Sequence, residues 1–135
     1  MRGTDWYPDL QLRLFDRRRG RWQGGLVHES VRVQGSVGRL RNEIEHYPYA
    51  DIAEHLRTID EYTSLWAEQA FAAGRGTSGL EMAGASLWAF VRGYLLRGGL
   101  LLGRVGFTVC ALGAYYTFLK LAKLDERTRR APQAR

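Results

Sequence analysis

Glu29 carries the side chain best suited to acid–base chemistry in this sequence. It lies in the run Val27-His28-Glu29-Ser30-Val31, and in a strand its carboxylate would share a face with the two valines. Ionising a carboxylate among apolar side chains is costly, so its pKa would rise, which suits a base that accepts a proton from a hydroxyl group. The alternative is that the strand ends here, with Glu29 solvated or paired with Arg13 or Arg32. The pattern leaves both interpretations open.

His28 and Arg13 are candidates for binding a metal ion or an anion. The imidazole of His28 could ligate a divalent metal or contact a diphosphate, although His46 and His55 show no ligand spacing with it. Arg13, within Gln11-Leu12-Arg13-Leu14-Phe15, could bind a phosphate through two parallel hydrogen bonds, from a strand face opposite the leucines. The alternatives are an ordinary hydrogen-bonded histidine and a solvated strand arginine.

The densest basic run is Asp16-Arg17-Arg18-Arg19-Gly20-Arg21-Trp22. Arginines pair with phosphates and Trp22 could stack on a base, so nucleic-acid binding is one interpretation. We favour a solvated hairpin turn, because four arginines make a small footprint and no nucleic-acid-binding motif accompanies them. Nucleic acid is therefore not the expected partner.

Composition limits the fold and the partners. The 135 residues are enough for one domain with a core, and a net charge of +6 favours anionic partners such as acidic lipid headgroups or phosphorylated substrates. The single cysteine, Cys110, lies in an apolar run, which excludes an internal disulfide and a cysteine-rich metal site. No secretory signal is visible at the N-terminus, so a cytoplasmic location is expected.

The elements that must position these residues predict an α+β fold that begins with strands. Residues 1–50 are expected to be strand-rich. Alternation of apolar and polar residues predicts a hairpin of strands 10–15 and 25–33 around a turn at 16–20, and a further short strand at 37–44.

A helix is predicted to follow over residues 51–73. Asp51 and Glu54 have the spacing of a capping box, and apolar residues then recur along one face at helical spacing, which makes the helix amphipathic. Residues 74–79 are rich in glycine and cannot sustain a helix, so they are predicted to form a linker.

Residues 80–124 are predicted to form two apolar helices with a break at Gly98-Gly99, and residues 125–135 a disordered basic tail. The two helices could pack as an ordinary hairpin, lie in a membrane interface, or span a bilayer. Because the charge-free stretch Val105–Leu119 is shorter than the ~20 residues that a span requires, we favour the interface, with an anionic membrane surface as the partner.

Several motif classes are absent from the sequence. It contains no catalytic triad, no phosphate-binding loop, no zinc signature and no dinucleotide fingerprint. It also contains no Asp-x-Asp pair, the usual clamp for a metal and a diphosphate in nucleotide-sugar enzymes.

Taken in order, five segments resemble the C-terminal half of inverting family-two glycosyltransferases, of the lipopolysaccharide-core glucosyltransferase type. The helix from Asp51, with Tyr62-Thr63 near its centre, is also similar. The segments are Trp6-Tyr7-Pro8-Asp9, Gln11-Leu12-Arg13-Leu14-Phe15, Val27-His28-Glu29, His46-Tyr47 and Phe118-Leu119-Lys120-Leu121-Ala122-Lys123-Leu124.

The resemblance implies a role for each candidate residue. Glu29 would be the catalytic base, His28 a metal or diphosphate contact and Arg13 a contact to the donor diphosphate, while Trp6 and Tyr7 would line the sugar pocket. Such enzymes have a GT-A fold whose N-terminal half binds the nucleotide sugar with a divalent metal, Mg or Mn. Residues 1–50 would then be the acceptor-side remnant of that α/β domain.

The resemblance also implies a location and a limit. The helical tail of these enzymes is membrane-associated, so we expect the cytoplasmic face of the inner membrane, with peripheral or partly inserted attachment. Because no nucleotide-binding half precedes Trp6, we expect a truncated product, a fragment or a mis-called start, inactive alone and without a bound cofactor. The complete enzyme would move a sugar to a lipopolysaccharide or related glycan. The alternative hypothesis is a small non-enzymatic basic protein of the membrane surface.

Overall fold

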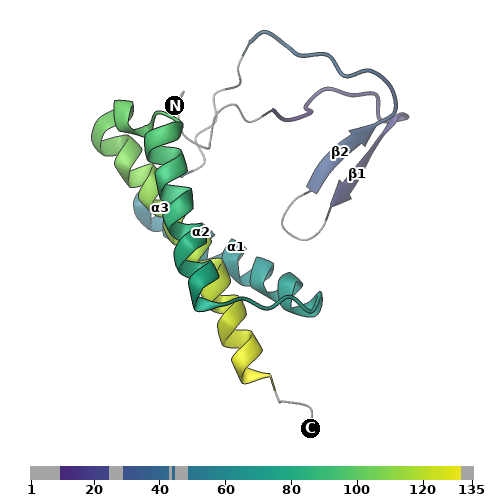
Figure 1. The fold of residues 1–135 in the computed structure, drawn as a ribbon. Coiled ribbons are helices and arrows are strands. Elements are labelled where there is room, and N and C mark those ends of the chain that lie inside the picture. The colour runs from purple at the N-terminus through teal and green to yellow at the C-terminus, as the bar shows by residue number, and fades with distance from the viewer. Residues whose placement is uncertain (1–9, 25–28, 43, 45–48, 132–135) are drawn as a thin grey trace. The chain divides into compact units, whose positions relative to one another are not determined.

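The computed structural model describes residues 10–24, 29–42, 44 and 49–131. They divide into two compact units, residues 10–58 and residues 59–131. In chain order the elements are β1 (Gly20–Gly24), β2 (Glu29–Val33), α1 (Ile52–Ala72), α2 (Gly79–Val91), the π-helical turn η1 (Arg92–Leu96), the 3-10 turn η2 (Gly99–Leu102) and α3 (Gly103–Arg130) (Figure 1). The predicted fold class, a strand hairpin followed by three helices with a long apolar last helix, is confirmed.

The two strands form an antiparallel ladder in which Trp22 lies opposite Val31 and Gly20 opposite Val33. The predicted strand at residues 10–15 is wrong, because this segment is irregular and Leu14 is exposed. Its alternation lacks a partner strand, whereas the end of the basic run pairs with β2. The strand predicted at 37–44 is also wrong for the described residues 37–42 and 44.

Local hydrogen bonds fix both ends of α1. The Asp51 carboxylate accepts a hydrogen bond from the Glu54 amide at 2.7 Å, and the Glu54 carboxylate accepts one from the Ala50 amide at 2.7 Å. At the other end Gly74 has φ +73°, and the Arg75 amide donates to the Ala70 carbonyl at 2.9 Å, as in a Schellman motif. The helix predicted at 51–73 is therefore confirmed as Ile52–Ala72.

α2 and α3 lie side by side as a helical hairpin (Figure 1). The Ser78 hydroxyl caps α2 by accepting from the Glu81 amide at 3.2 Å. The break between the helices includes Gly98 and Gly103 at φ +77° and +56°, conformations that L side chains rarely adopt. The break predicted at Gly98-Gly99 is thus present, and the structure extends it into a π-helical turn and a 3-10 turn.

α3 continues to Arg130, so the prediction of a disordered tail from residue 125 is wrong over 125–130. The side chains of Arg129 and Asp125 form an ion pair one turn apart, and Arg130 pairs with Glu126 at 2.6 Å. Pairs at this spacing support a helix, and cations in the last turn complement its dipole. Residues 132–135 lie outside the described residues.

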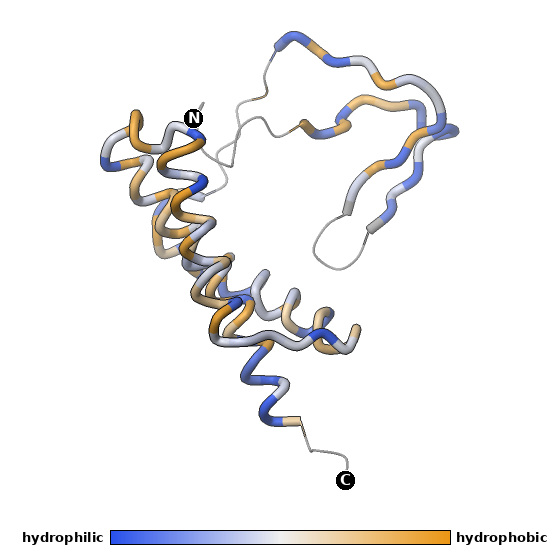
Figure 2. Tube along the Cα trace, in the orientation of Figure 1, coloured by the Kyte–Doolittle hydropathy of each residue, from blue (hydrophilic) through white to orange (hydrophobic). Residues whose placement is uncertain are grey.

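The buried side chains of the 59–131 unit come from α1 and α3. Thr63 is fully buried, and its hydroxyl donates to the Ile59 carbonyl at 2.7 Å, so that this polar group is satisfied. The buried apolar residues are Ile59, Ala67, Val109, Cys110, Leu121 and Leu124. This core is small beside the number of exposed apolar side chains on α2 and α3. Figure 2 shows the apolar stretches of these helices in orange.

Candidate functional site

The 10–58 unit holds a cavity of about 230 Å³ beside the strand hairpin, which we call the hairpin pocket. Its lining residues are Leu12, Leu14, Phe15, Asp16, Arg19, Val33, Gln34, Gly35, Ser36, Val37 and Gly38. The volume is below the ~300–1,000 Å³ of pockets that hold drug-sized ligands. The hairpin pocket therefore suits a small group more than a whole nucleotide sugar.

Short-range contacts shape one wall of the hairpin pocket. The Arg19 amide donates to the Asp16 carbonyl at 2.9 Å, and the Gln34 amide donates to the Arg19 carbonyl at 3.1 Å. A side chain at Gly20 would clash with the Phe15 ring, so glycine at this position lets that ring pack against the start of β1. The wall is thus held by contacts around the turn and the ends of the two strands.

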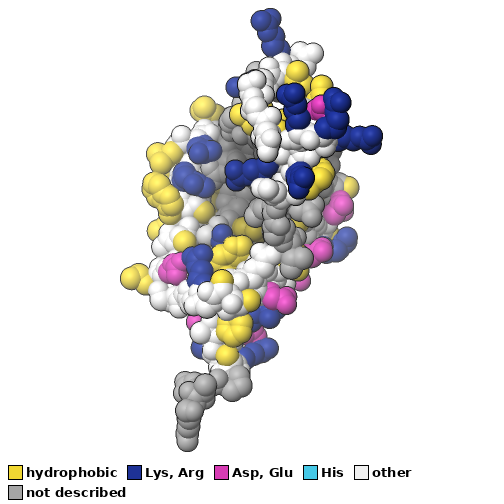
Figure 3. Space-filling model, turned by 90° about the vertical axis from the view of Figure 1, so that its right-hand side faces the viewer, with side chains coloured by type: hydrophobic (Ala, Val, Ile, Leu, Met, Phe, Trp, Pro, Cys, Tyr) yellow, Lys and Arg dark blue, Asp and Glu magenta, His cyan; other side chains and the backbone are white. Residues whose placement is uncertain are grey.

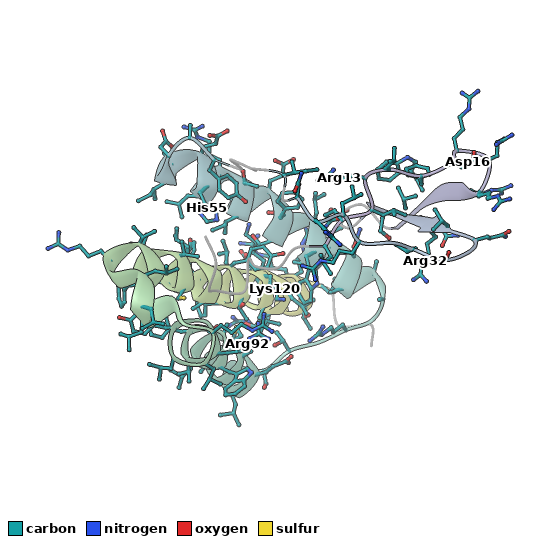
Figure 4. All side chains as sticks on the ribbon, turned by 90° about the horizontal axis from the view of Figure 1, so that it is seen from above. Arg13, Asp16, Arg32, His55, Arg92 and Lys120 are labelled. Carbon is teal, nitrogen blue, oxygen red and sulfur yellow. The ribbon has the colours of Figure 1, made fainter. Side chains whose placement is uncertain are left out.

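Asp16 is the one carboxylate among the lining residues. Its Oδ1 accepts a hydrogen bond from the Arg18 amide at 2.9 Å, and its Oδ2 pairs with the Arg18 guanidinium at 2.9 Å. The Arg18 side chain first, and then its amide, lower the pKa of Asp16 from its ordinary value. A carboxylate that holds its charge this firmly is a poor base near neutral pH, so Asp16 (Figure 4) serves to fix the turn.

Arg13 is exposed and is not among the residues that line the hairpin pocket. Its sequence neighbours Leu12 and Leu14 do line the hairpin pocket. Arg13 is labelled in Figure 4. The strand face on which we expected Arg13 does not exist, since residues 10–15 are irregular. A role in binding phosphate stays a prediction.

Glu29 opens β2, where its backbone is paired with Gly24. Its side chain is outside the described part of the structure. Val31 and Val33, the other members of the predicted valine face, are only half-buried in β2. The role of Glu29 as a base stays a prediction.

Trp6, Tyr7 and His28 lie outside the described residues. Arg13 is accordingly the one predicted site residue whose side chain is described. Among the residues that are described, no group of three or more His, Cys, Asp or Glu side chains could hold a metal ion. The described residues therefore do not provide a metal site.

A basic and aromatic cluster in the 59–131 unit was missed by sequence reasoning. Lys120 Nζ lies 4.9 Å from the ring centroid of Trp66 and 5.6 Å from that of Tyr116, and Arg75 Cζ lies 5.1 Å from the Trp66 centroid. Burial, and then the charge of Arg75, lower the pKa of Lys120. Trp66 and Lys120 are far apart in sequence, and no periodicity links them, so no sequence signal could have found this contact.

Lys123 is likewise used within the protein. Its ammonium donates to the Asp60 carbonyl at 2.7 Å and to Ser64 Oγ at 2.7 Å, and it pairs with Asp60 Oδ1 at 2.8 Å. Lys120 and Lys123 thus both join α3 to α1.

α3 and the turn before it form one run, Gly99–Arg130, that is long and apolar enough by length and composition to cross a membrane. Within the described residues it is the one such run, and 22% of its most apolar window is buried in the protein. A core helix of a soluble protein passes the same test but is mostly buried. The low burial leaves much apolar surface of this run without a partner among the described residues.

Two known proteins are similar to most of this chain. The chain is 30% identical over 118 residues to the lipopolysaccharide core biosynthesis glycosyltransferase LpsC of Rhizobium meliloti (strain 1021). The aligned region covers 86% of this chain and 44% of that protein. The chain is also 26% identical over 101 residues to the uncharacterized glycosyltransferase RP128 of Rickettsia prowazekii (strain Madrid E). This aligned region covers 75% of this chain and 35% of that protein.

The chain thus spans less than half the length of these curated relatives. No protein-family model matches the chain, and no solved structure matches it. The comparisons support the predicted resemblance at the level of glycosyltransferases, including one of lipopolysaccharide core biosynthesis. The GT-A fold, and the place of these residues within a longer enzyme, stay predictions.

Proposed function

We propose that this chain is the acceptor-side part of a membrane-associated glycosyltransferase that moves a sugar from a nucleotide-sugar donor to a lipopolysaccharide or related cell-envelope glycan. The observation that carries the proposal is the similarity to LpsC over 86% of the chain. The size of the hairpin pocket is compatible with one part of a divided site, because about 230 Å³ is too little for a whole nucleotide sugar.

In the proposed reaction Glu29 accepts the proton of an acceptor hydroxyl. The hydroxyl oxygen then forms a bond to the anomeric carbon on the face opposite the nucleotide diphosphate. The bond to the diphosphate breaks, and the configuration of the sugar is inverted. Arg13 and His28 would bind the departing diphosphate, whereas Trp6 and Tyr7 would contact the sugar.

A divalent metal, Mg²⁺ or Mn²⁺, belongs to this proposal only for the complete enzyme, where it would neutralise charge on the diphosphate. The described residues of this chain contain no cluster that could hold it. We expect the 135-residue chain to bind no nucleotide sugar tightly and to transfer no sugar by itself, because it spans less than half the length of the relative from which the activity is inferred.

The test uses the longest reading frame that contains this chain. Transfer of labelled sugar to cell-envelope glycan should be abolished by Glu29→Gln, because the amide cannot accept the hydroxyl proton. Glu61→Gln, which changes an exposed carboxylate on α1, is the matched control and should keep full activity. Equal activity of the Glu29→Gln variant and the parent would remove Glu29 as the base, and transfer by the 135-residue chain alone would overturn the divided site.

A second candidate function is that of a small basic membrane-surface protein without enzymatic activity. The low burial of the Gly99–Arg130 run is the observation that favours it. Both candidates place the protein at the cytoplasmic face of the inner membrane, so membrane binding does not separate them. Intact vesicle binding together with no transfer by the longest reading frame would favour this second function.

A further inference from the structure

The end of the α2–α3 hairpin exposes a dense group of apolar side chains. We call residues 92–106, which comprise η1, η2 and the first turn of α3, the hairpin tip. Its large apolar side chains that are more than half exposed are Leu95, Leu96, Leu100, Leu101 and Val105. Leu101 is 88% exposed, and Figure 2 shows orange stretches separated by white and blue ones at this end of the hairpin.

The backbone of the hairpin tip is held by glycines that pack against one another. A Cβ at Gly106 would clash with the Gly99 carbonyl, and a Cβ at Gly99 would lie 2.8 Å from Cys110 Sγ and 2.9 Å from the Gly93 carbonyl. Beside them, Phe107 packs edge-on against the rings of Phe90 and Tyr94, at 5.6 and 5.8 Å between centroids. This packing holds the backbone that presents the leucines at the surface.

The charge of the hairpin tip is purely positive. Arg92, Arg97 and Arg104 are exposed among the leucines, and Arg92 is labelled in Figure 4. The sequence contains no aspartate or glutamate from Met82 to Leu124. On the face that Figure 3 shows, which is the right-hand side of Figure 1, apolar, basic and acidic side chains are all exposed. Exposed leucines with cations and no carboxylates are complementary to an anionic lipid surface.

The opposite end of the hairpin differs in charge, because acidic residues accompany its cations. Leu80, at the start of α2, is 85% exposed but lies next to Glu81, whose carboxylate pairs with Arg75 at 2.9 Å. Lys120 and Lys123 are engaged with side chains of α1. The hairpin tip, in contrast, carries three arginines and has no aspartate or glutamate in its own segment, residues 92–106.

We propose that the hairpin tip inserts end-on into an anionic bilayer, with its leucines at the level of the acyl chains and its three arginines at the phosphates of the headgroups. The helices then stand away from the surface instead of lying flat along it. The proposal specifies the element and the lipid chemistry behind the membrane attachment suggested above, and it does not depend on sugar transfer. A second copy of the chain is a poorer occupant, because two tips would bring like charges together.

The test compares Leu101→Asp with Leu80→Asp in the full chain. Both leucines are almost fully exposed, so neither substitution disturbs the core, and helix content by circular dichroism should stay unchanged. Binding is measured by flotation with vesicles of phosphatidylcholine and phosphatidylglycerol. We expect Leu101→Asp to weaken partitioning at least about tenfold, because a carboxylate replaces a side chain that would be buried in lipid. Leu80→Asp should stay within about twofold of the parent.

Equal losses for the two variants would indicate flat binding and would overturn end-on insertion. No loss for either variant would also overturn it. If Leu101→Asp instead abolished a dimer seen by analytical ultracentrifugation in a parent that does not float, the hairpin tip would be a contact between copies, and the proposal would fail.

A second pair of measurements tests depth and charge. Tryptophan introduced at position 101 should be quenched by lipids brominated on their acyl chains, whereas tryptophan at position 80 should not. Arg97→Gln together with Arg104→Gln should lower affinity for vesicles that contain phosphatidylglycerol and leave the weak affinity for pure phosphatidylcholine unchanged. Two results separate this inference from the proposed enzymatic function. Glu29→Gln should abolish sugar transfer and leave flotation normal, whereas Leu101→Asp should reduce flotation and leave sugar transfer normal.

Discussion

The two units of this protein are stabilised in different ways. In the 10–58 unit the strand hairpin is supported by hydrogen bonds near its turn and strand ends, such as those from Arg18 to Asp16 and from Gln34 to Arg19, and its described side chains are half-buried or exposed. The 59–131 unit contains the fully buried side chains, among them Leu124 and Thr63. Arg13 and the backbone of Glu29, both proposed for chemistry, lie in the unit with less burial.

The largest effect should come from Leu124→Ala in the 59–131 unit. Leu124 is completely buried, so truncation should lower the free energy of unfolding by about 2–5 kcal/mol. Val33→Ala, in the half-buried strand hairpin, should cost less than about 1 kcal/mol. Urea unfolding followed by circular dichroism measures both values. Similar losses would contradict the contrast between the two units.

A smaller loss is expected from Gly106→Ala in α3. The added methyl group would clash with the Gly99 carbonyl, so the hairpin must open slightly, at a cost of about 1–3 kcal/mol. Gly113→Ala is the matched control, because it lies in the same helix with open space around its Cα, and alanine there should stabilise the helix by about 0.5–1 kcal/mol. The difference in melting temperature between the variants checks the sign of each effect, and stabilisation by both would refute close packing at Gly106.

Lys123→Met should destabilise the contact between α1 and α3 by about 1–3 kcal/mol. The substitution removes the hydrogen bonds to the Asp60 carbonyl and to Ser64 while it retains most of the apolar stem. Arg127→Met, which changes an exposed cation in the same helix, should stay within about 0.5 kcal/mol of the parent. A double-mutant cycle with Ser64→Ala would show no coupling energy if the contact were absent in solution.

The smallest effect concerns Asp16 and is a dependence on pH. Hydrogen bonds from Arg18 lower the pKa of Asp16 below its ordinary value of 3.8. A carboxylate whose pKa is depressed in the folded state stabilises that state above its unfolded pKa, and the contribution is lost as pH falls through the folded pKa. The turn should therefore persist at pH 4 and weaken only in stronger acid.

Carbon-detected NMR titration of the Asp16 carboxyl group, with Arg18→Ala as the comparison, measures this shift. The titration midpoint of Asp16 should rise toward its ordinary value in the Arg18→Ala variant. An unchanged midpoint would show that Arg18 does not hold the carboxylate in solution.

Sequence reasoning succeeded where structure is decided locally. The caps at Asp51 and Gly74 lie next to the residues that they terminate, so α1 could be predicted to within a residue at each end. The same reasoning extended disorder into α3, because it weighed the polarity of residues 125–130 but missed the ion pairs one turn apart that support a helix there.

The first strand was misplaced for a physical reason. Alternation along residues 10–15 shows what one strand would look like but does not reveal its partner, and the segment that pairs with β2 is Gly20–Gly24. The hairpin pocket depends on contacts such as Gln34 to Arg19, between segments separated by the two strands. The sequence therefore indicated the segment that contains the candidate site, but it did not indicate the hairpin pocket or the residues that line it.

Because Cys110 packs closely against the glycines of the hairpin tip, the accessibility of its thiol reports local opening of the α2–α3 hairpin. Cys110 is buried and forms no disulfide, and its sulfur lies against the positions of Gly93 and Gly99. A thiol reagent can reach it only when the two helices separate. The labelling rate of this thiol therefore measures how often the hairpin opens. Binding of the hairpin tip to a bilayer should lower that rate.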